Sequence, residues 1–429
     1  MDGMEETPGD AETVERVQWT EEILSVIGVL QELAHKHSLE PDHLSPGERD
    51  PSLTIEHMGG KLETWETLHS ILLPSIRGQL TLLLTSLDLI DPKRNPKSVT
   101  EPTLEILSDL DITLGGIVSA VVSLTRKPPL PDENRDQGLE KVKVFRCSYL
   151  NENIQLLVVR FIYHRLFLDL IPSFIRWCAR ANIHIQDDSL VQEGSALRAQ
   201  IQLIISYCNG IITRTINWGK RSDWVNIHRS WIEAHGILGE ALEAFTWRTN
   251  LTTQGTPEAG PNENNETTPT TELIGKVAES AIPLVKLARI LSKKTSENLL
   301  KKRISTLDTT LELNSETIKQ LHETPDSMLR LYYLSSLSCF PDRSGRVIPV
   351  DQQNSIRSVI QNLPRDMEST LTVLNSCLIP LLAKIKHDPP DSQWAAFLLD
   401  LKQSWDKASE RLIAVLVPFQ LERTATAVE

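Results

Sequence analysis

The chain has 429 residues, of which 24% are charged and 40% hydrophobic, a balance typical of folded globular proteins rather than disordered ones. Its formal net charge of −13 argues against general binding to nucleic acids, because neutralising phosphates requires clustered Lys and Arg. The five cysteines are odd in number and form no CxxC pair, which favours a reducing compartment over a disulfide framework.

Apolar residues recur at helical spacing along nearly the whole chain, and strand-like alternation is almost absent. We therefore predict an all-α protein with loops at the clusters of Pro, Gly, Asn and Asp. The predicted helices cover residues 12–37, 61–89, 101–126, 139–181, 188–218, 222–248, 271–292, 296–323, 326–340, 352–387 and 392–419.

The first 54 residues are expected to form a separate acidic segment with one helix. Residues 1–22 lack an apolar run, so they do not resemble a signal or transit peptide. The longest uncharged apolar stretch, residues 112–125, is shorter than the roughly 20 residues that span a bilayer. We expect no membrane span and a cytoplasmic or nuclear protein.

A polar stretch divides the remainder of the chain. Residues 250–270 are rich in Thr, Asn, Pro and Glu and contain almost no apolar side chain, which is typical of a flexible linker. The sequence thus predicts a first helical bundle at 55–249, a disordered linker at 250–270 and a second, shorter bundle at 271–429.

Four predicted helices carry apolar side chains with alternating spacings of four and three residues, which places them on one stripe that packs against neighbouring helices. Prolines at positions 74, 172, 283 and 380 fall inside predicted helices, so we expect kinks there. The pattern predicts tandem kinked bundles. The stripes are Thr103–Leu107–Leu110–Leu114–Ile117–Val121–Leu124, Trp224–His228–Trp231–His235–Leu238–Leu242–Phe245, Leu300–Ile304–Leu307–Leu311–Asn314–Ile318–Leu321 and Trp394–Leu398–Leu401–Trp405–Ala408–Leu412–Val415.

These stripes occur in pairs, which suggests an internal duplication. The segment 110–114 (LDITL) matches 307–311 (LDTTL), and Ser222-Asp223-Trp224 matches Ser392-Gln393-Trp394. Chance likeness between Leu-rich helices is the alternative.

The sharpest pattern for metal chemistry is Glu-x-x-His, which occurs at Glu32/His35 and Glu66/His69. Di-iron bundles use two such motifs with a further Glu from each of two other helices. Here the neighbouring stripes carry Leu and Ile where those carboxylates would be needed. Solvated side chains or capping contacts are therefore favoured over a metal site.

Two other features invite a binding role. Trp224, His228, Trp231 and His235 (the Trp/His seam, residues 224–235) share one stripe, and indole and imidazole rings together can line a ligand slot. Core packing with satisfied ring nitrogens is the favoured interpretation.

The dense basic run at 286–303 suits a phosphate-bearing or acidic partner, although a solvated helix face explains it more simply. It consists of Lys286, Arg289, Lys293, Lys294, Lys301, Lys302 and Arg303.

Three blocks carry a family resemblance: residues 72–88 (LLPSIRGQLTLLLTSLD), 104–114 (LEILSDLDITL) and 216–231 (INWGKRSDWVNIHRSW). Residues 55–250 resemble an uncharacterised family of all-helical proteins that is multiplied in rust fungi. More remotely, the kinked bundles resemble cyclin-D-binding and vinculin-like proteins, whose role is to bind other proteins. The resemblance implies an all-helical fold but no functional residue.

No motif specifies a reaction, and we predict neither catalytic, cofactor-binding nor metal-binding residues. The expected function is a non-catalytic, intracellular protein–protein interaction or scaffold module with an unknown protein partner. The alternative is a helical bundle that binds a small ligand or a metal.

Overall fold

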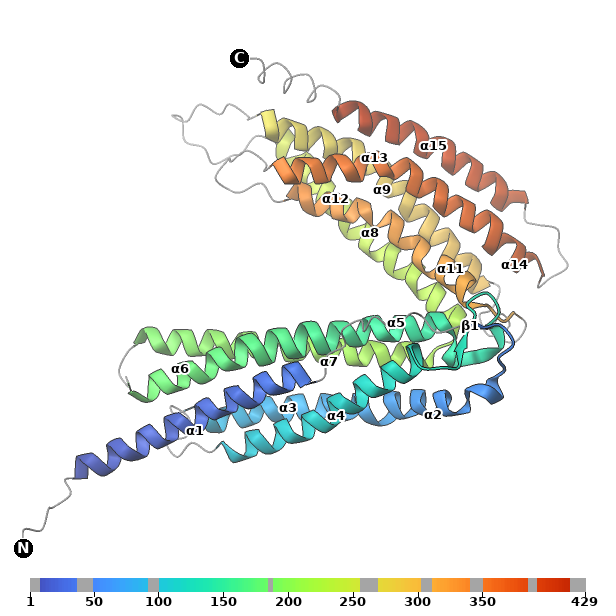
Figure 1. The fold of residues 1–429 in the computed structure, drawn as a ribbon. Helices are drawn as coiled ribbons and strands as arrows, with labels where there is room; N and C mark the ends of the chain where they lie inside the picture. Colours follow the sequence, from blue (N-terminus) through green and yellow to red (C-terminus); the bar gives the residue numbers. More distant parts are fainter. Residues whose placement is uncertain are drawn as a thin grey trace, which may run out of the picture. The chain divides into compact units, whose positions relative to one another are not determined.

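The computed structural model describes residues 8–36, 49–91, 100–183, 188–254, 269–301, 311–339, 350–384 and 392–416. Almost all of these residues are helical, so the predicted all-α class is confirmed (Figure 1). Among the described residues, extended pairing is limited to β1 (Arg49–Asp50) and β2 (Leu130–Pro131), which run parallel. The chain folds into two compact units, residues 1–221 and 222–429.

The division between the units lies 28 residues before the start of the predicted linker, so the predicted bundle bounds 55–249 and 271–429 differ from the bounds of the two units. Helix α8 (Asp223–Gln254) packs along α9 (Pro269–Lys301) and belongs to the second unit. The polar composition of 250–270 therefore marks a connection within a helical pair, and residues 255–268 lie outside the described residues. The segment 1–54 is not separate either, because α1 (Pro8–Lys36) packs against other helices of unit 1.

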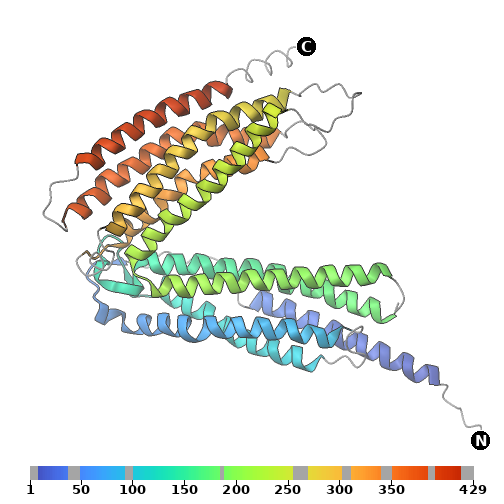
Figure 2. The same ribbon diagram turned by 180° about the vertical axis from the view of Figure 1, so that it is seen from behind.

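Unit 1 is built from long helical rods, by which we mean helices that continue through several elements without a break. The two such rods are α2–η2–α3 and α5–η4–α6. Helix α3 packs against α4 and α7, and α1 lies against α4, η4 and α6 (Figure 2). Asp88 of α3 meets Arg198 of α7, and His69 of η2 meets Gly219, so the α2–η2–α3 rod and α7 run antiparallel. Besides α1, the helical elements are η1 (Ile55–Met58), α2 (Gly59–Thr67), η2 (Leu68–Leu72), α3 (Leu73–Ile90), α4 (Glu101–Thr125), η3 (Gln137–Val142), α5 (Val144–Gln155), η4 (Leu156–Leu170), α6 (Ile171–Ile183) and α7 (Asp188–Lys220).

Unit 2 is a second bundle in which each helix packs against its neighbours around a shared core. Helix α9 packs against both α8 and α15. Helix α13 packs against α15, α11 and α12, and both α11 and α12 also pack against α8. The remaining elements are α11 (Ser315–Met328), α12 (Arg330–Cys339), α13 (Val350–Val373), η5 (Leu374–Leu378), α14 (Ile379–Lys384) and α15 (Ser392–Leu416).

Three of the four interior prolines are accommodated by π-helical turns. Pro74, Pro172 and Pro380 each stand two residues after a π-helical segment, namely η2, η4 and η5. A proline cannot bond to the carbonyl four residues earlier, and in each case that carbonyl lies inside the π-helical segment. The wider turn absorbs the lost bond, so the rods continue through these prolines. Pro283 lies within α9.

The predicted inward stripe is buried throughout on α4 and for the most part on α8 and α15, where His228, His235, Leu242 and Val415 are half-buried. The four Trp residues at 224, 231, 394 and 405 are each at most 8% exposed. The prediction that the stripe from Leu300 to Leu321 lies on a single helix is wrong. Helix α9 ends at Lys301, Leu311–Asn314 is not helical, and Leu300 is exposed. The Asn314 side chain caps α11 by accepting the Thr317 N–H at 3.0 Å, which begins a new helix there.

The suggested duplication does not follow the division into units. Its two Trp helices, α8 and α15, both belong to unit 2. Residues 307–310 of the second LDxTL segment lie outside the described residues, while the first segment lies within α4.

Two described stretches, Ile55–Ile90 and Glu101–Thr125, are long and apolar enough to cross a bilayer by length and composition. Both pack against other helices of unit 1, and a core helix meets the same criterion. They do not establish a membrane span.

Candidate functional site

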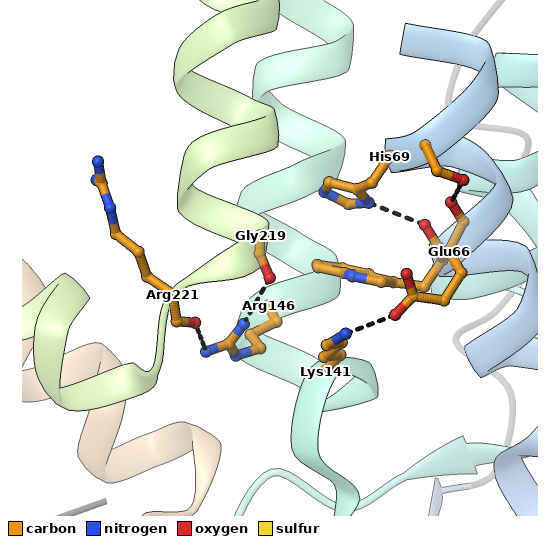
Figure 3. A network of polar contacts seen from close by, with 8 residues as sticks. Glu66, His69, Lys141, Arg146, Gly219 and Arg221 are labelled. Carbon is orange, nitrogen blue, oxygen red and sulfur yellow. Dashed lines mark hydrogen bonds and ion pairs between the residues drawn. The ribbon is translucent and has the colours of Figure 1, made fainter. Parts of the chain in front are cut away.

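A cluster of buried polar side chains lies where η2, α5 and the end of α7 meet (Figure 3). Lys61, Trp65 and His69 follow one another at intervals of four residues, which places them on the buried face of the α2–η2 rod. Arg146 of α5 and Gly219 of α7 approach the same region. We call these five residues the His69 cluster.

The imidazole of His69 is fixed on both sides. It stacks on Trp65 with ring centroids 4.3 Å apart, and Nδ1 lies 2.9 Å from the Trp65 carbonyl oxygen. Because a carbonyl only accepts, Nδ1 carries the proton in the neutral ring. The other nitrogen, Nε2, is buried without a hydrogen-bond partner among the described residues. Burial lowers the pKa of His69, which keeps the ring neutral.

The His69 ring leaves room only for glycine at position 219. A Cβ atom added at position 219 would lie 2.4 Å from His69 Nε2, closer than any real Cβ contact. Helix α7 and the η2 rod therefore approach each other at a distance that only glycine permits.

Arg146 closes the end of α7. Its guanidinium is buried and donates to the carbonyl oxygens of Arg221 at 2.7 Å and Gly219 at 3.5 Å. The last carbonyls of a helix have no donor within it, and they attract positive charge. The guanidinium also lies 5.4 Å from the centre of the Trp218 ring. Arg146 thus caps α7 from inside the unit.

Lys61 has the same role at α4. Its ammonium group donates to the Leu124 carbonyl oxygen at 3.2 Å, one residue before the end of that helix. Burial lowers the pKa of Lys61, and burial raises the pKa of the nearby Cys147 thiol to about 12. The thiol is protonated at neutral pH, so it is not the thiolate that acts as a nucleophile.

The two Glu-x-x-His motifs are not assembled into a metal site. Glu66 pairs with Lys141 at 2.5 Å, and His69 faces Gly219. Glu32 and His35 are exposed on α1, where His35 Nδ1 lies 2.6 Å from the Gln31 carbonyl oxygen. Within the part of the chain that the structure describes, no three His, Cys, Asp or Glu residues converge as metal ligands would.

The two indole N–H groups of the Trp/His seam on α8 donate hydrogen bonds to backbone carbonyls of neighbouring segments. Trp224 Nε1 donates to the Leu311 carbonyl at 3.1 Å, and Trp231 Nε1 donates to the Leu321 carbonyl at 3.2 Å. The second of these carbonyls lies four residues before Pro325, which has no N–H to offer it. The indole therefore replaces the missing helical donor.

The two histidines of the seam bond to α9. His235 Nδ1 lies 3.1 Å from the Arg289 carbonyl oxygen. Burial lowers the pKa of His228, and a bond with the Ser296 backbone opposes that shift. These contacts are the satisfied core packing that the sequence favoured over a ligand slot.

The basic run at 286–303 divides between several environments. Lys286, Lys293 and Lys294 are exposed on α9, where Lys293 lies 3.9 Å from Glu297. Lys294 Nζ lies 3.8 Å from the centre of the Phe397 ring of α15. The side chain of Lys301 and the residues Lys302 and Arg303 lie outside the described part.

Sequence reasoning missed the caps made by Lys61 and Arg146. A signal existed for Lys61, which precedes Trp65 by four residues and Leu68 by seven and so lies on the apolar stripe. A cation in that position indicates a buried partner. No local pattern links Arg146 to a carbonyl 75 residues later.

A second feature lies on the outside of unit 1. Six positions on one face of the α3 rod are exposed, none of them is charged, and three carry large aliphatic side chains: Ile71 (57% exposed), Leu82 (57%) and Leu89 (38%). Spacings of four and three residues align them along the helix. This α3 stripe consists of Ile71, Ser75, Gly78, Leu82, Thr85 and Leu89.

Comparison with known families divides the chain at the same place as the structure. Residues 61–220 match a family model described as Domain of unknown function (DUF8723), and residues 222–414 match one described as Domain of unknown function (DUF8721). No curated protein and no solved structure matches the chain. The border between the two matches coincides with the border between the units at Arg221 and Ser222. The chain therefore carries two adjacent regions that match domains of unknown function, and each region lies within one helical unit.

Proposed function

We propose that this chain is a non-catalytic, cytoplasmic or nuclear protein–protein interaction module and that the α3 stripe is its contact surface. The observation that carries the proposal is the row of exposed aliphatic side chains on α3 without a charged residue among its six positions. Exposed aliphatic side chains that share one face of a helix, here with only small uncharged residues between them, occur on binding surfaces.

The polar groups of unit 1 favour the same proposal. The cationic side chains of the His69 cluster are engaged with helix ends, and Cys147 is a protonated thiol. The cluster therefore serves the fold, whereas the α3 stripe is exposed. The remote resemblance to cyclin-D-binding and vinculin-like proteins agrees with a binding role. We also propose that the chain is related to the uncharacterised helical family that is multiplied in rust fungi. Within the described ranges, no comparable observation favours a bundle that encloses a ligand or a metal.

The test compares captured proteins between matched variants of the full chain. Leu82→Glu places a charge at the centre of the stripe, and Leu203→Glu places one at a similarly exposed leucine on α7 (53% exposed). Tagged wild type and both variants are incubated with native cell extract, and retained proteins are quantified by mass spectrometry. We expect specific proteins to be lost with Leu82→Glu and kept with Leu203→Glu. Equal retention by all three proteins would contradict the proposal, as would the loss of the same proteins in both variants.

A further inference from the structure

The guanidinium of Arg289 on α9 lacks a counter-charge within the described part of the chain. The side chain is half-buried, its Nε is enclosed without a hydrogen-bond partner, and no carboxylate among the described residues pairs with it. An ionised group that is partly removed from water is costly unless an opposite charge or hydrogen bonds compensate for it. An unpaired N–H group of a half-buried cation therefore marks a place where the fold can accept an anion.

The guanidinium lies flat over a glycine of the neighbouring helix. A Cβ added to Gly239 of α8 would lie 3.7 Å from each of Cζ, Nε and Nη2 of Arg289, so the plane of the guanidinium faces Gly239. The N–H bonds lie in that plane and run along the surface instead of pointing into α8. Three residues earlier on α8, Gly236 is exposed and has open space around its Cβ position. The two glycines thus leave room beside the guanidinium.

The backbone at this place is already fixed. His235 of α8 bonds to the carbonyl oxygen of Arg289, with Nδ1 at 3.1 Å. The two helices are therefore held together at the level of the guanidinium, and binding of a ligand there does not have to order them first.

Two lysines stand on the same side of α9 as Arg289. Lys286 and Lys293 are exposed and lie three residues before and four residues after it, a spacing that aligns the three cations along the helix. Lys294 is on the other side, where its Nζ lies 3.8 Å from the centre of the Phe397 ring of α15. The basic run of α9 is thus divided, and three of its cations border α8.

Carboxylates on the same two helices do not neutralise these cations. Glu297 lies 3.9 Å from Lys293 in an exposed pair, and such pairs stabilise little. Glu243 follows Gly239 by one turn on α8, and no ion pair joins it to Arg289. The border between α8 and α9 therefore keeps a local positive charge, although the whole chain has a net charge of −13.

We propose that Arg289, Lys286 and Lys293 bind a phosphate group at the surface where α8 and α9 meet. This site belongs to unit 2 and is separate from the α3 stripe, so it goes beyond the proposed function. A phosphate group carries nearly two negative charges at neutral pH and several strong acceptor oxygens. A planar guanidinium between two ammonium groups complements that charge and those acceptors, whereas a carboxylate brings a single charge.

The experiment titrates the full chain with inorganic phosphate in a calorimeter at neutral pH. Sodium chloride keeps the ionic strength constant, because salt screens exposed charges. Arg289→Gln removes the charge and keeps an amide donor, and Gly236→Leu fills the space beside the guanidinium without changing any charge. The matched controls are Lys294→Gln, which removes the same charge from the α15 side of α9, and Gly210→Leu on α7, where the glycine is likewise exposed and unobstructed.

We expect the wild type to bind phosphate saturably, with a dissociation constant of about 1 mM or lower. Arg289→Gln and Gly236→Leu should each weaken binding at least about tenfold, because one removes charge-assisted hydrogen bonds and the other occupies the space. Both controls should match the wild type. Acetate should bind at least about tenfold more weakly than phosphate, because it carries one charge.

Melts followed by circular dichroism without phosphate establish that the variants are folded. Arg289→Gln should melt no lower than the wild type, because its guanidinium has no partner to lose among the described residues. A clear fall in its melting temperature would mean that the guanidinium serves the fold, which contradicts the proposal.

The titrations can overturn the site in three further ways. The wild type could show no saturable binding up to about 20 mM phosphate, a concentration far above the expected dissociation constant. Arg289→Gln could bind as well as the wild type. Lys294→Gln could lose as much affinity as Arg289→Gln, which would show diffuse attraction to a basic helix instead of a site.

O-phosphoserine, titrated in the same way, separates two sources of the phosphate group. Tighter binding than inorganic phosphate supports a site for a phosphate monoester, and weaker binding supports a site for the free anion. Either ligand must lose affinity with Arg289→Gln. Undiminished binding of phosphoserine to that variant would contradict the proposal.

Discussion

Buried cations in unit 1 stabilise helix ends. Lys61 donates to the end of α4 and Arg146 to the end of α7, in both cases from a different helix. A buried charge is costly unless it is paired, and unpaired helix-end carbonyls are costly too. Each contact offsets both costs at once. The helices are thereby fixed relative to one another at their ends.

At the residue scale, the contact between Gly219 and His69 predicts a steep penalty for any side chain at position 219. Gly219→Ala should lower the free energy of unfolding by about 1–3 kcal/mol, the usual cost of overpacking a closed site. Gly210→Ala should instead raise it slightly, by about 0.5–1 kcal/mol, because the position is exposed and Ala favours helix. Chemical denaturation of both variants measures the difference, and equal effects would mean that the contact yields without cost.

His69 also predicts a dependence of stability on pH. Burial lowers its pKa, aided by Lys141 and Arg146 and opposed by Glu66 and the Trp65 carbonyl. The unfolded chain then binds a proton more readily than the folded chain, so stability is lost as pH falls below the unfolded value of about 6.5.

His69→Asn keeps a donor for the Trp65 carbonyl and does not titrate. The difference in melting temperature between wild type and this variant should shrink between pH 7.5 and 5. Parallel curves for His69→Asn would show that the ring does not titrate with folding.

At the scale of elements, four of the prolines inside helices have a local compensation for the hydrogen bond that they remove. Three stand after π-helical turns, and Pro325 of α11 is served by another helix, since Trp231 donates to the Leu321 carbonyl. Helices of both units thus continue through these prolines.

The Trp231 bond predicts unequal costs for two similar substitutions. Trp231 and Trp405 are both buried, but Trp405 Nε1 has no hydrogen-bond partner among the described residues. Trp231→Phe leaves the Leu321 carbonyl without a donor and should cost about 1–3 kcal/mol more than Trp405→Phe.

A double-mutant cycle isolates the cause of that difference. Pro325→Ala restores the helical N–H, so Trp231→Phe should cost less in its presence. Urea unfolding of the four proteins supplies the coupling energy. A coupling near zero would mean that the indole bond does not compensate for the proline.

At the scale of the whole molecule, the chain is two bundles whose border is the single turn at Arg221 and Ser222. Arg146 caps the last turn before this border from within unit 1, and Trp224 begins the packing of unit 2 immediately after it. A few residues therefore separate two independently packed cores.

This border predicts the behaviour of two fragments. Residues 1–221 should unfold cooperatively with the helix content of unit 1, because their core contacts lie within the fragment. Residues 1–249 should carry α8 without α9 or α11, leaving Trp224 and Trp231 without their partners. Limited proteolysis should trim the longer fragment back to about residue 221, as expected for an unpacked terminal segment. A protease-resistant 1–249 fragment would place α8 in unit 1 instead.

The sequence by itself determined the helical class, most helix bounds and the buried stripes on α4, α8 and α15. Helical spacing of apolar residues is a local signal, and burial of the stripe follows from it whatever the partner helix is.

Only the tertiary structure decided which helix belongs to which unit, and which polar groups meet. The polar composition of 250–270 does not show whether the helices on either side pack against each other, and α8 and α9 do. Likewise, Arg146 and Lys61 act on carbonyls 75 and 63 residues away. Such contacts are selected by the packing of whole helices, because a hydrogen bond between distant residues leaves no periodic trace in the chain.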